Sequence, residues 1–152
     1  SPLWACRSGY VDELTVPFIG PERSARMYPF GSLVRAGARL AFGSDWAVST
    51  NDPLPQVEVA VTRIAPETRS LEPLLPDEAL DLPAALTAFT AGAAYVNFLE
   101  AETGTIEPSK LADLVVLDRD VLDPGSGPMG DARVLLTLSE GEAVYADPGF
   151  GW

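Results

Sequence analysis

The chain has 152 residues, 47% of them apolar, which is enough material for the core of one domain or for part of a larger one. Its 22 acidic and 10 basic residues give a formal net charge of −12, and so acidic a surface argues against nucleic acid or anionic lipid as a partner. The chain has no histidine, which excludes histidine-assisted nucleophiles and removes the commonest metal ligand.

The cellular location is predicted from the single cysteine and from two missing signals. Cys6 has no partner for an internal disulfide, which favours a reducing compartment and a role as a small buried apolar residue. No apolar run approaches the ~20 residues of a membrane helix, and no leader-like segment opens the chain. We therefore expect a cytoplasmic protein without a membrane partner.

The first third of the chain is predicted to contain two short helices. Pro21 suits the first turn of a helix over 21–27. Pro29 interrupts this pattern, and a second helix over 30–36 ends at Gly37 as its C-cap.

Residues 39–45 have the pattern of a short buried strand. A period of two places Leu40, Phe42 and Ser44 on one face, and Ala41, Gly43 and Asp45 on the other. The second face has two minimal side chains followed by a carboxylate, which indicates a strand that leaves room at its C-terminal end.

The middle of the chain is predicted to be helical with one long loop. After a loop over 46–51, Asp52 caps a helix that runs to about Ile64. Three prolines make 66–76 a surface loop, and 77–99 is mostly helical with a break at Pro83.

The last third changes to short strands and turns. The β-branched and apolar runs predict four strands, with a hairpin turn at Glu140–Gly141, over residues 105–106, 113–118, 134–138 and 143–145. So few strands need a partner sheet. The order of elements predicts an α/β fold, the C-terminal end of a TIM-like α/β barrel followed by part of a separate β module.

Asp45 is the strongest candidate for a catalytic residue. Active-site residues of α/β barrels lie at the C-terminal ends of strands, where Asp45 is predicted to lie. A carboxylate there can bind a divalent cation or transfer a proton. The alternative is an aspartate whose side chain caps the next turn, and the local sequence does not separate the two.

Several motifs in order resemble amidohydrolase family 3, the group of YtcJ-like proteins and N-substituted formamide deformylases. The segment around Gly43-Ser44-Asp45-Trp46 is the most telling, and the likeness covers nearly the whole chain, to about Asp147. The other matching segments are 20–33, 36–38, 52–54, 60–63, 85–94 and 104–118.

This resemblance implies a distorted (β/α)8 barrel and a β-sandwich built from both chain ends. Residues 1–100 would then belong to the barrel and 101–152 to the sandwich. In the family most metal ligands are histidines on earlier strands, and Asp45 matches the aspartate of the last strand as a metal contact and proton shuttle. The complete enzyme would use a divalent metal, zinc by preference, on a small amide-like substrate. This chain alone would bind no metal and be inactive, because one carboxylate is not a catalytic site.

Other candidate residues have plainer alternatives. Trp46 would line a substrate pocket or pack under a loop, while Arg26 and Tyr28 lie near the barrel mouth in the family. An arginine there would grip a substrate oxygen or form a surface ion pair. Asp113 is expected to have a structural role. Lys110 is not expected to act as a nucleophile, because a lysine in a turn stays solvated. Two departures from the family pattern, Ser109 for glycine and Ala47 for proline, leave the role of Asp45 untouched.

Three functions remain open. The first is the C-terminal portion of an amidohydrolase acting on a non-peptide C–N bond. The second is a stand-alone, acidic, non-catalytic packing or interaction module. The third is a glycosidase with Asp45 and Asp52 as its carboxylate pair, although Asp52 is better explained as a helix cap. In the first case exposed apolar faces predict a homo-oligomer.

Overall fold

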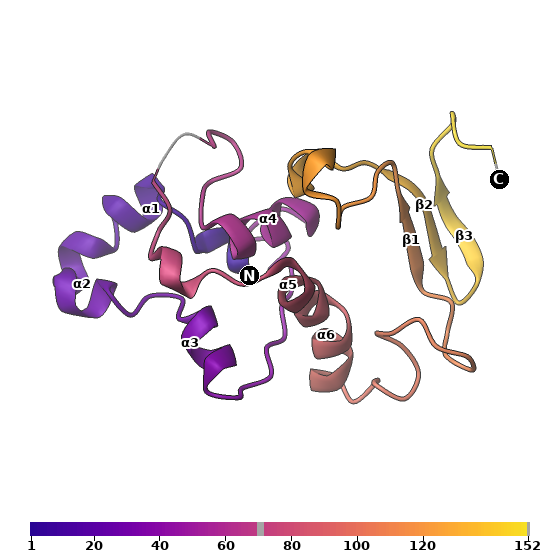
Figure 1. The fold of residues 1–152 in the computed structure, drawn as a ribbon, viewed down its shortest axis with the longest axis horizontal. Helices are drawn as coiled ribbons and strands as arrows, with labels where there is room; N and C mark the ends of the chain where they lie inside the picture. Colours follow the sequence, from indigo (N-terminus) through magenta and orange to yellow (C-terminus); the bar gives the residue numbers. More distant parts are fainter. Residues whose placement is uncertain (70–71, 152) are drawn as a thin grey trace.

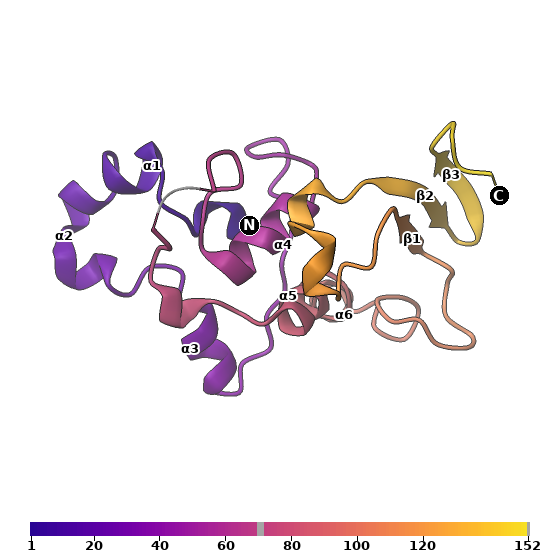
Figure 2. The ribbon, with the colours of Figure 1, turned by 45° about the horizontal axis from the view of Figure 1, so that its top comes forward.

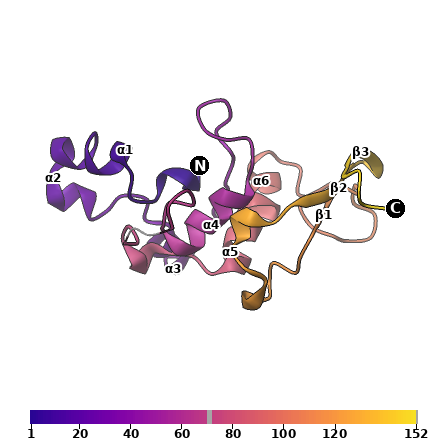
Figure 3. The same cartoon turned by 90° about the horizontal axis from the view of Figure 1, so that it is seen from above.

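A computed structural model describes residues 1–69 and 72–151 of the chain. The molecule is elongated, with α1 and α2 at one end, the other helices in the middle and a small sheet at the opposite end (Figure 1). Views turned by 45° and 90° show the same order along the long axis (Figures 2 and 3). In the described part of the chain, no helix has the length and apolar character to cross a membrane.

Short helices make up the N-terminal end. They are η1 (Pro2–Trp4), α1 (Gly9–Asp12), α2 (Val16–Ser24) and α3 (Phe30–Arg35). The helix predicted over 21–27 is the second half of α2, which Gly20 interrupts with a φ of 77°; it ends earlier than predicted, at Ser24. The helix predicted over 30–36 is confirmed as α3, and Gly37 follows it with a φ of 84°.

The helix α4 (Leu54–Thr62) is the centre of the molecule. The N-cap position is Pro53 and not Asp52 as predicted, but the Asp52 Oδ1 accepts a hydrogen bond from the amide of the first helical residue, Leu54, at 2.9 Å. The helix ends two residues before the predicted Ile64, because Arg63 takes a left-handed conformation with a φ of 61°. Five successive residues of α4, from Gln56 to Ala60, are buried.

The region predicted as broken helix over 77–99 contains η2 (Pro76–Glu78), α5 (Leu82–Phe89) and α6 (Ala91–Val96). Pro83 lies in the first turn of α5, where proline costs no hydrogen bond, and the Asp81 side chain caps this helix. A second break, which the sequence did not indicate, occurs at Thr90 between α5 and α6. The preceding loop was predicted over 66–76, and its residues 70 and 71 lie outside the described residues.

Two predicted strands are wrong. Residues 39–45 form no strand, since the one backbone amide bonded from within the segment, that of Phe42, donates to Ala88 O of helix α5 at 2.9 Å. No neighbouring strand pairs with it among the described residues, so the hydrogen bonds that would make this alternating segment a strand are missing. Thr105–Ile106 is likewise irregular, because no strand pairs with it among the described residues; the Thr105 hydroxyl accepts a hydrogen bond from the Lys110 ammonium.

The remaining strands form one antiparallel sheet in the order β1-β2-β3. They are β1 (Leu114–Leu117), β2 (Val134–Ser139) and β3 (Glu142–Ala146). The hairpin prediction is confirmed: Glu140 and Gly141 join β2 to β3, and their φ angles of 54° and 86° match a type I′ turn. The glycine is needed there because this turn requires positive φ at both central positions.

The core lies around α4. One cluster contains Ala5, Cys6, Val59 and Ala65, and a second contains Val57, Ala60, Leu80 and Ala85. Burial raises the pKa of the Cys6 thiol to about 11, in keeping with its predicted role as a buried apolar residue.

An ion network connects α4 to the loop before β2. Glu58, of which only 6% of the side chain is exposed, accepts two hydrogen bonds from Arg69, at 2.6 and 3.0 Å, and one from the Gly130 amide at 2.8 Å. Arg69 also pairs with Asp131 in the short helix η4 (Met129–Asp131), which follows η3 (Pro124–Ser126).

Taken together, the described residues form a small α/β structure with one three-stranded sheet, and by themselves they form neither a closed barrel nor a sandwich.

Candidate active site

The segment that leads to Asp45 keeps the predicted alternation although it is not a strand. Leu40, Phe42 and Ser44 are half-buried, whereas Ala41, Gly43 and Asp45 are exposed. A Cβ added at Gly43 would meet no atom within 4 Å, so the exposed side of the segment is open. The prediction of which face carries the carboxylate is therefore confirmed.

Helix α6 and an aromatic cluster fix this segment in place. A Cβ at Gly92 would lie 2.1 Å from Leu40 O, so only glycine allows the segment to approach α6 this closely. The Phe42 ring packs edge-on against Phe30 and Phe89, with ring centroids 5.0 and 5.5 Å apart. The Arg39 guanidinium lies 3.9 Å from the Tyr95 ring centroid, in a cation–π contact.

Asp45 begins a tight turn with its backbone, and its carboxylate has no hydrogen-bond or ion-pair partner among residues 1–69 and 72–151. Its carbonyl accepts hydrogen bonds from the amides of Val48 at 2.8 Å and Ser49 at 3.0 Å, and its own φ is 58°. The Ser44 hydroxyl accepts a bond from the Trp46 amide at 3.3 Å. The alternative in which the Asp45 side chain caps this turn is not what the described residues show. In the same region, the Asp52 side chain is engaged at the start of α4, where its Oδ1 accepts the hydrogen bond from the Leu54 amide.

Gln56 is a site residue that the sequence analysis missed. It is fully buried at the start of α4, and its Nε2 donates to three backbone carbonyls, those of Ser44 at 3.2 Å, Thr50 at 3.1 Å and Asp52 at 3.4 Å. Its Oε1 accepts a hydrogen bond from Ser1 at 2.8 Å. An amide side chain within the apolar run of a helix was the signal that could have identified it.

The three predicted substrate contacts differ in their surroundings. Trp46 is 69% exposed, so it does not pack under its loop. Arg26 is exposed and makes no ion pair within residues 1–69 and 72–151, contrary to the surface-pair alternative. Tyr28 is half-buried beside Phe30, with ring centroids 6.2 Å apart, and burial raises the pKa of its phenol above the ordinary value. Through Phe30 and Phe42, Tyr28 is connected by ring contacts to the segment that carries Asp45.

The donor set near Asp45 does not make a complete metal site. No group of three or more histidine, cysteine, aspartate or glutamate side chains comes together in the part of the chain that the structure describes. One carboxylate supplies at most one of the roughly three protein ligands of a catalytic zinc site. Asp45 can therefore contribute to such a site but cannot form it with its present neighbours.

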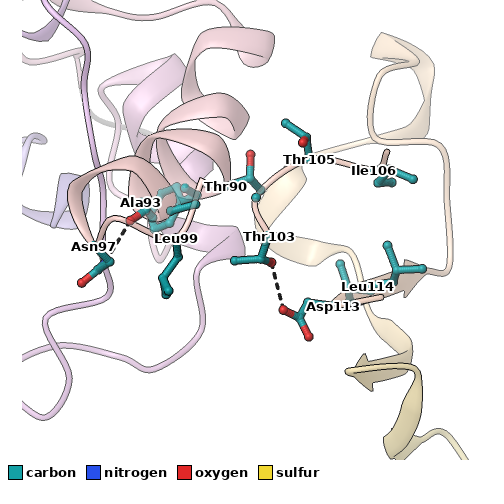
Figure 4. Close-up of a pocket in the computed structure, with 13 residues that line it drawn as sticks. Thr90, Ala93, Asn97, Leu99, Thr103, Thr105, Ile106, Asp113 and Leu114 are labelled. Atoms are coloured by element: carbon teal, nitrogen blue, oxygen red, sulfur yellow. Dashed lines mark hydrogen bonds between the residues drawn. The ribbon is translucent and has the colours of Figure 1, made fainter. Parts of the chain in front are cut away.

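The larger of two described pockets lies away from Asp45, between α6 and the start of β1 (Figure 4). It has a volume of about 680 Å³, and its lining is mostly apolar, including Phe89, Ala93, Leu99 and Ile106. Its polar side chains are already bonded: Thr103 donates to Asp113 at 2.9 Å, and Asn97 donates to Ala93 O at 2.8 Å. Neither this pocket nor the second, between α4 and residues 121–129, includes Asp45 or the other predicted site residues.

Lys110 and Asp113 have structural roles, as predicted for Asp113. Asp113 also accepts a hydrogen bond from the Glu140 amide at 2.9 Å, which ties the hairpin turn to the start of β1. Hydrogen bonds from Glu140 and Thr103 lower the pKa of this carboxyl. The Lys110 ammonium donates to Glu100 O at 2.8 Å and to the Thr105 hydroxyl, so it closes the loop after α6.

The chain belongs to the amidohydrolase family, whose model matches residues 2–145. This confirms the family inferred from the motifs around Asp45. Among relatives, it is 36% identical over 128 residues to N-substituted formamide deformylase of Arthrobacter pascens, a match that covers 84% of this chain and 23% of that protein.

Two further relatives match the same share of the chain. Protein LONG AFTER FAR-RED 3 of Arabidopsis thaliana is 38% identical over 128 residues, covering 84% of this chain and 21% of that protein. A Bacillus subtilis protein named as the amidohydrolase YtcJ is 26% identical over 129 residues, covering 84% and 24%. The chain thus spans about a quarter of the length of these relatives. No solved structure matches it significantly.

Proposed function

We propose that this chain is the C-terminal portion of a metal-dependent amidohydrolase that hydrolyses a non-peptide, amide- or formamide-like C–N bond. Family membership supports the class of reaction, and the name of the Arthrobacter relative supports a formamide as substrate. Residues 1–100 would complete the distorted (β/α)8 barrel and residues 101–152 would join the β-sandwich. The substrate would be a small molecule, in the cytoplasm.

The observation that carries this proposal is the free carboxylate of Asp45 on a firmly held segment. The segment is fixed by Gly92, by the Phe42 ring and by Gln56, while the carboxylate itself faces outward. Asp45 would accept the proton of the attacking water and deliver it to the leaving nitrogen, so that the amine leaves neutral. Zinc would contact Asp45 and take its other ligands from outside the described residues.

Three further residues would bind the substrate in the complete protein. The exposed Trp46 ring directly follows the carboxylate and would pack against the apolar substituent. Arg26 has a guanidinium without an ion pair in the described part of the chain, and Tyr28 has a neutral phenol, so both could donate hydrogen bonds to a substrate oxygen.

The test is Asp45→Asn in the complete protein that contains this chain, prepared with zinc and assayed for formate release from N-substituted formamides. We expect turnover to fall roughly 100-fold or more, because the amide of asparagine cannot accept the proton. Asp52→Asn is the matched control, since the asparagine Oδ1 can still accept the hydrogen bond from the Leu54 amide and should keep α4 and the activity intact. Full turnover by Asp45→Asn would rule out the assigned role.

The same experiment addresses the alternative of a non-catalytic module. Absence of formamide and amide hydrolysis by the complete wild-type protein with zinc would favour that module. The absence of histidine from the 152 residues is the observation that keeps it open.

A further inference from the structure

We propose that Gln56 is a positioning residue that holds Asp45 for proton transfer, an inference that rests on the function proposed above. The Asp45 carboxylate has no side-chain partner among the described residues, so its place is set by the backbone around it. Two points of that backbone are fixed by one side chain. Gln56 binds Ser44 O, directly before Asp45, and Thr50 O, at the far end of the turn.

The hydrogen bonds of Gln56 span the loop between Ser44 and Asp52, which joins the Asp45 segment to α4. Its third acceptor, Asp52 O at 3.4 Å, lies two residues before the first helical residue Leu54. An amide nitrogen has two protons, so three acceptors share them, and the acceptor oxygen is satisfied by Ser1 at 2.8 Å. Both amide protons are therefore engaged within the chain, and the buried side chain has no donor left for a ligand.

Burial makes these bonds important for the position of the loop. Gln56 has no exposed surface, and hydrogen bonds in a buried environment are stronger and costlier to lose than bonds in water. In Figure 3 the chain that leads into α4 projects from the body of the molecule. The bonds from the Val48 and Ser49 amides to Asp45 O and from the Ser49 hydroxyl to Ser44 O join residues within this loop, whereas Gln56 ties the loop to helix α4. Without Gln56, the Ser44 and Thr50 carbonyls would lose their common donor and the two ends of the loop could move apart.

The experiment compares Gln56→Met and Gln56→Glu with Asp45→Asn in the complete, zinc-loaded protein. Gln56→Met keeps the size of the side chain but removes its donor. We expect kcat to fall roughly 10- to 100-fold with little change in KM, because misplacement of a catalytic group weakens the transition state and not substrate binding. Hydrogen exchange of the Val48 and Ser49 amides should become faster, while exchange in α5 should not change.

The pH dependence of kcat in Gln56→Glu is a measurement that a purely structural role of Gln56 would leave unchanged. A protonated glutamic acid can still donate to one carbonyl, whereas an ionised one would face three carbonyl oxygens. The ratio of its kcat to that of the wild type should therefore fall as the pH rises, at temperatures where both are folded. Thr62→Val is the control, because the Thr62 hydroxyl donates to Glu58 O and accepts from the Ile64 amide, at the end of α4 away from the loop.

The outcomes separate this proposal from the proposed function. If Asp45→Asn is inactive but both Gln56 variants keep the wild-type kcat and pH profile, the positioning role is wrong and the proposed function stands. An equal loss in Thr62→Val would also overturn the positioning role. If Asp45→Asn keeps full activity, the catalytic assignment itself fails, and the positioning role fails with it.

Discussion

Arg63 is the largest fully buried side chain in the described part of the chain. Its Nε donates to Leu74 O at 2.8 Å and its Nη1 donates to Tyr28 O at 3.2 Å, while Nη2 has no partner among the described residues. Burial lowers the pKa of the guanidinium, and the charge of Glu78 opposes this effect. One side chain thus joins the end of α4 to the segment that carries Tyr28.

We expect Arg63→Lys to lower the free energy of unfolding by about 3 kcal/mol, because an ammonium cannot reach both carbonyls as the planar guanidinium does. Urea denaturation measures the change. Arg26→Lys is the matched control, since the exposed Arg26 should change stability by less than about 0.5 kcal/mol. Equal stability of Arg63→Lys and the wild type would mean that these two bonds contribute nothing to the fold.

The sequence predicted which face of its segment carries Asp45, but neither the irregular conformation of that segment nor the residues that hold it. The alternation of residues 40–45 follows from the sequence alone, because small and large side chains alternate there. Gln56, Arg63 and Gly92 act through backbone atoms distant in sequence, and no local pattern encodes such contacts. Tertiary bonds of this kind had to be seen in the structure.

At the scale of elements, Asp118 joins the end of β1 to the start of β2. Its carboxylate accepts hydrogen bonds from Arg119 Nε at 2.9 Å, from the Arg133 amide at 3.0 Å and from Arg133 Nε at 3.1 Å. These bonds, that from Arg119 first, hold the pKa of the Asp118 carboxyl well below its usual range. Stability from this group is therefore present above the unfolded-state pKa of about 4 and is lost as the pH falls through the folded-state pKa.

Asp118→Asn should consequently be less stable than the wild type at neutral pH, and the difference should narrow below about pH 4. Urea denaturation followed by far-ultraviolet circular dichroism, repeated over this pH range, checks the result. Asp120→Asn is the control, because the exposed Asp120 bonds only to the nearby Leu122 amide. A stability difference that stays constant with pH would contradict the assignment.

Elements defined by local signals were predicted well, and those that depend on distant partners were not. The helix α3 and the Glu140–Gly141 hairpin each follow from residues within a few positions of one another. Residues 39–45 instead needed a neighbouring strand, and in its absence they pack on α5 and α6. Alternation of apolar and small residues specifies which face of a segment is buried, but the segment becomes a strand only when a neighbouring strand pairs with it through backbone hydrogen bonds.

At the scale of the molecule, large apolar side chains remain exposed around the pocket between α6 and β1. Leu99, Ile106 and Val115 line it, with 43%, 87% and 54% of their surfaces exposed. All polar groups described there are engaged within the chain, so the pocket offers contact area and little hydrogen bonding. Apolar patches of this kind favour association with another protein surface.

We therefore expect the isolated chain to form oligomers, as the sequence analysis predicted, and Ile106→Ser to shift light-scattering masses towards the monomer. Removal of one exposed isoleucine side chain weakens association because burial of apolar area drives it. Phe18→Ser is the matched control: Phe18 is 82% exposed but lies on α2, at the opposite end of the molecule from the sheet (Figure 1). Monomeric wild type at all concentrations would contradict the prediction, and an equal effect of both substitutions would place the contact elsewhere.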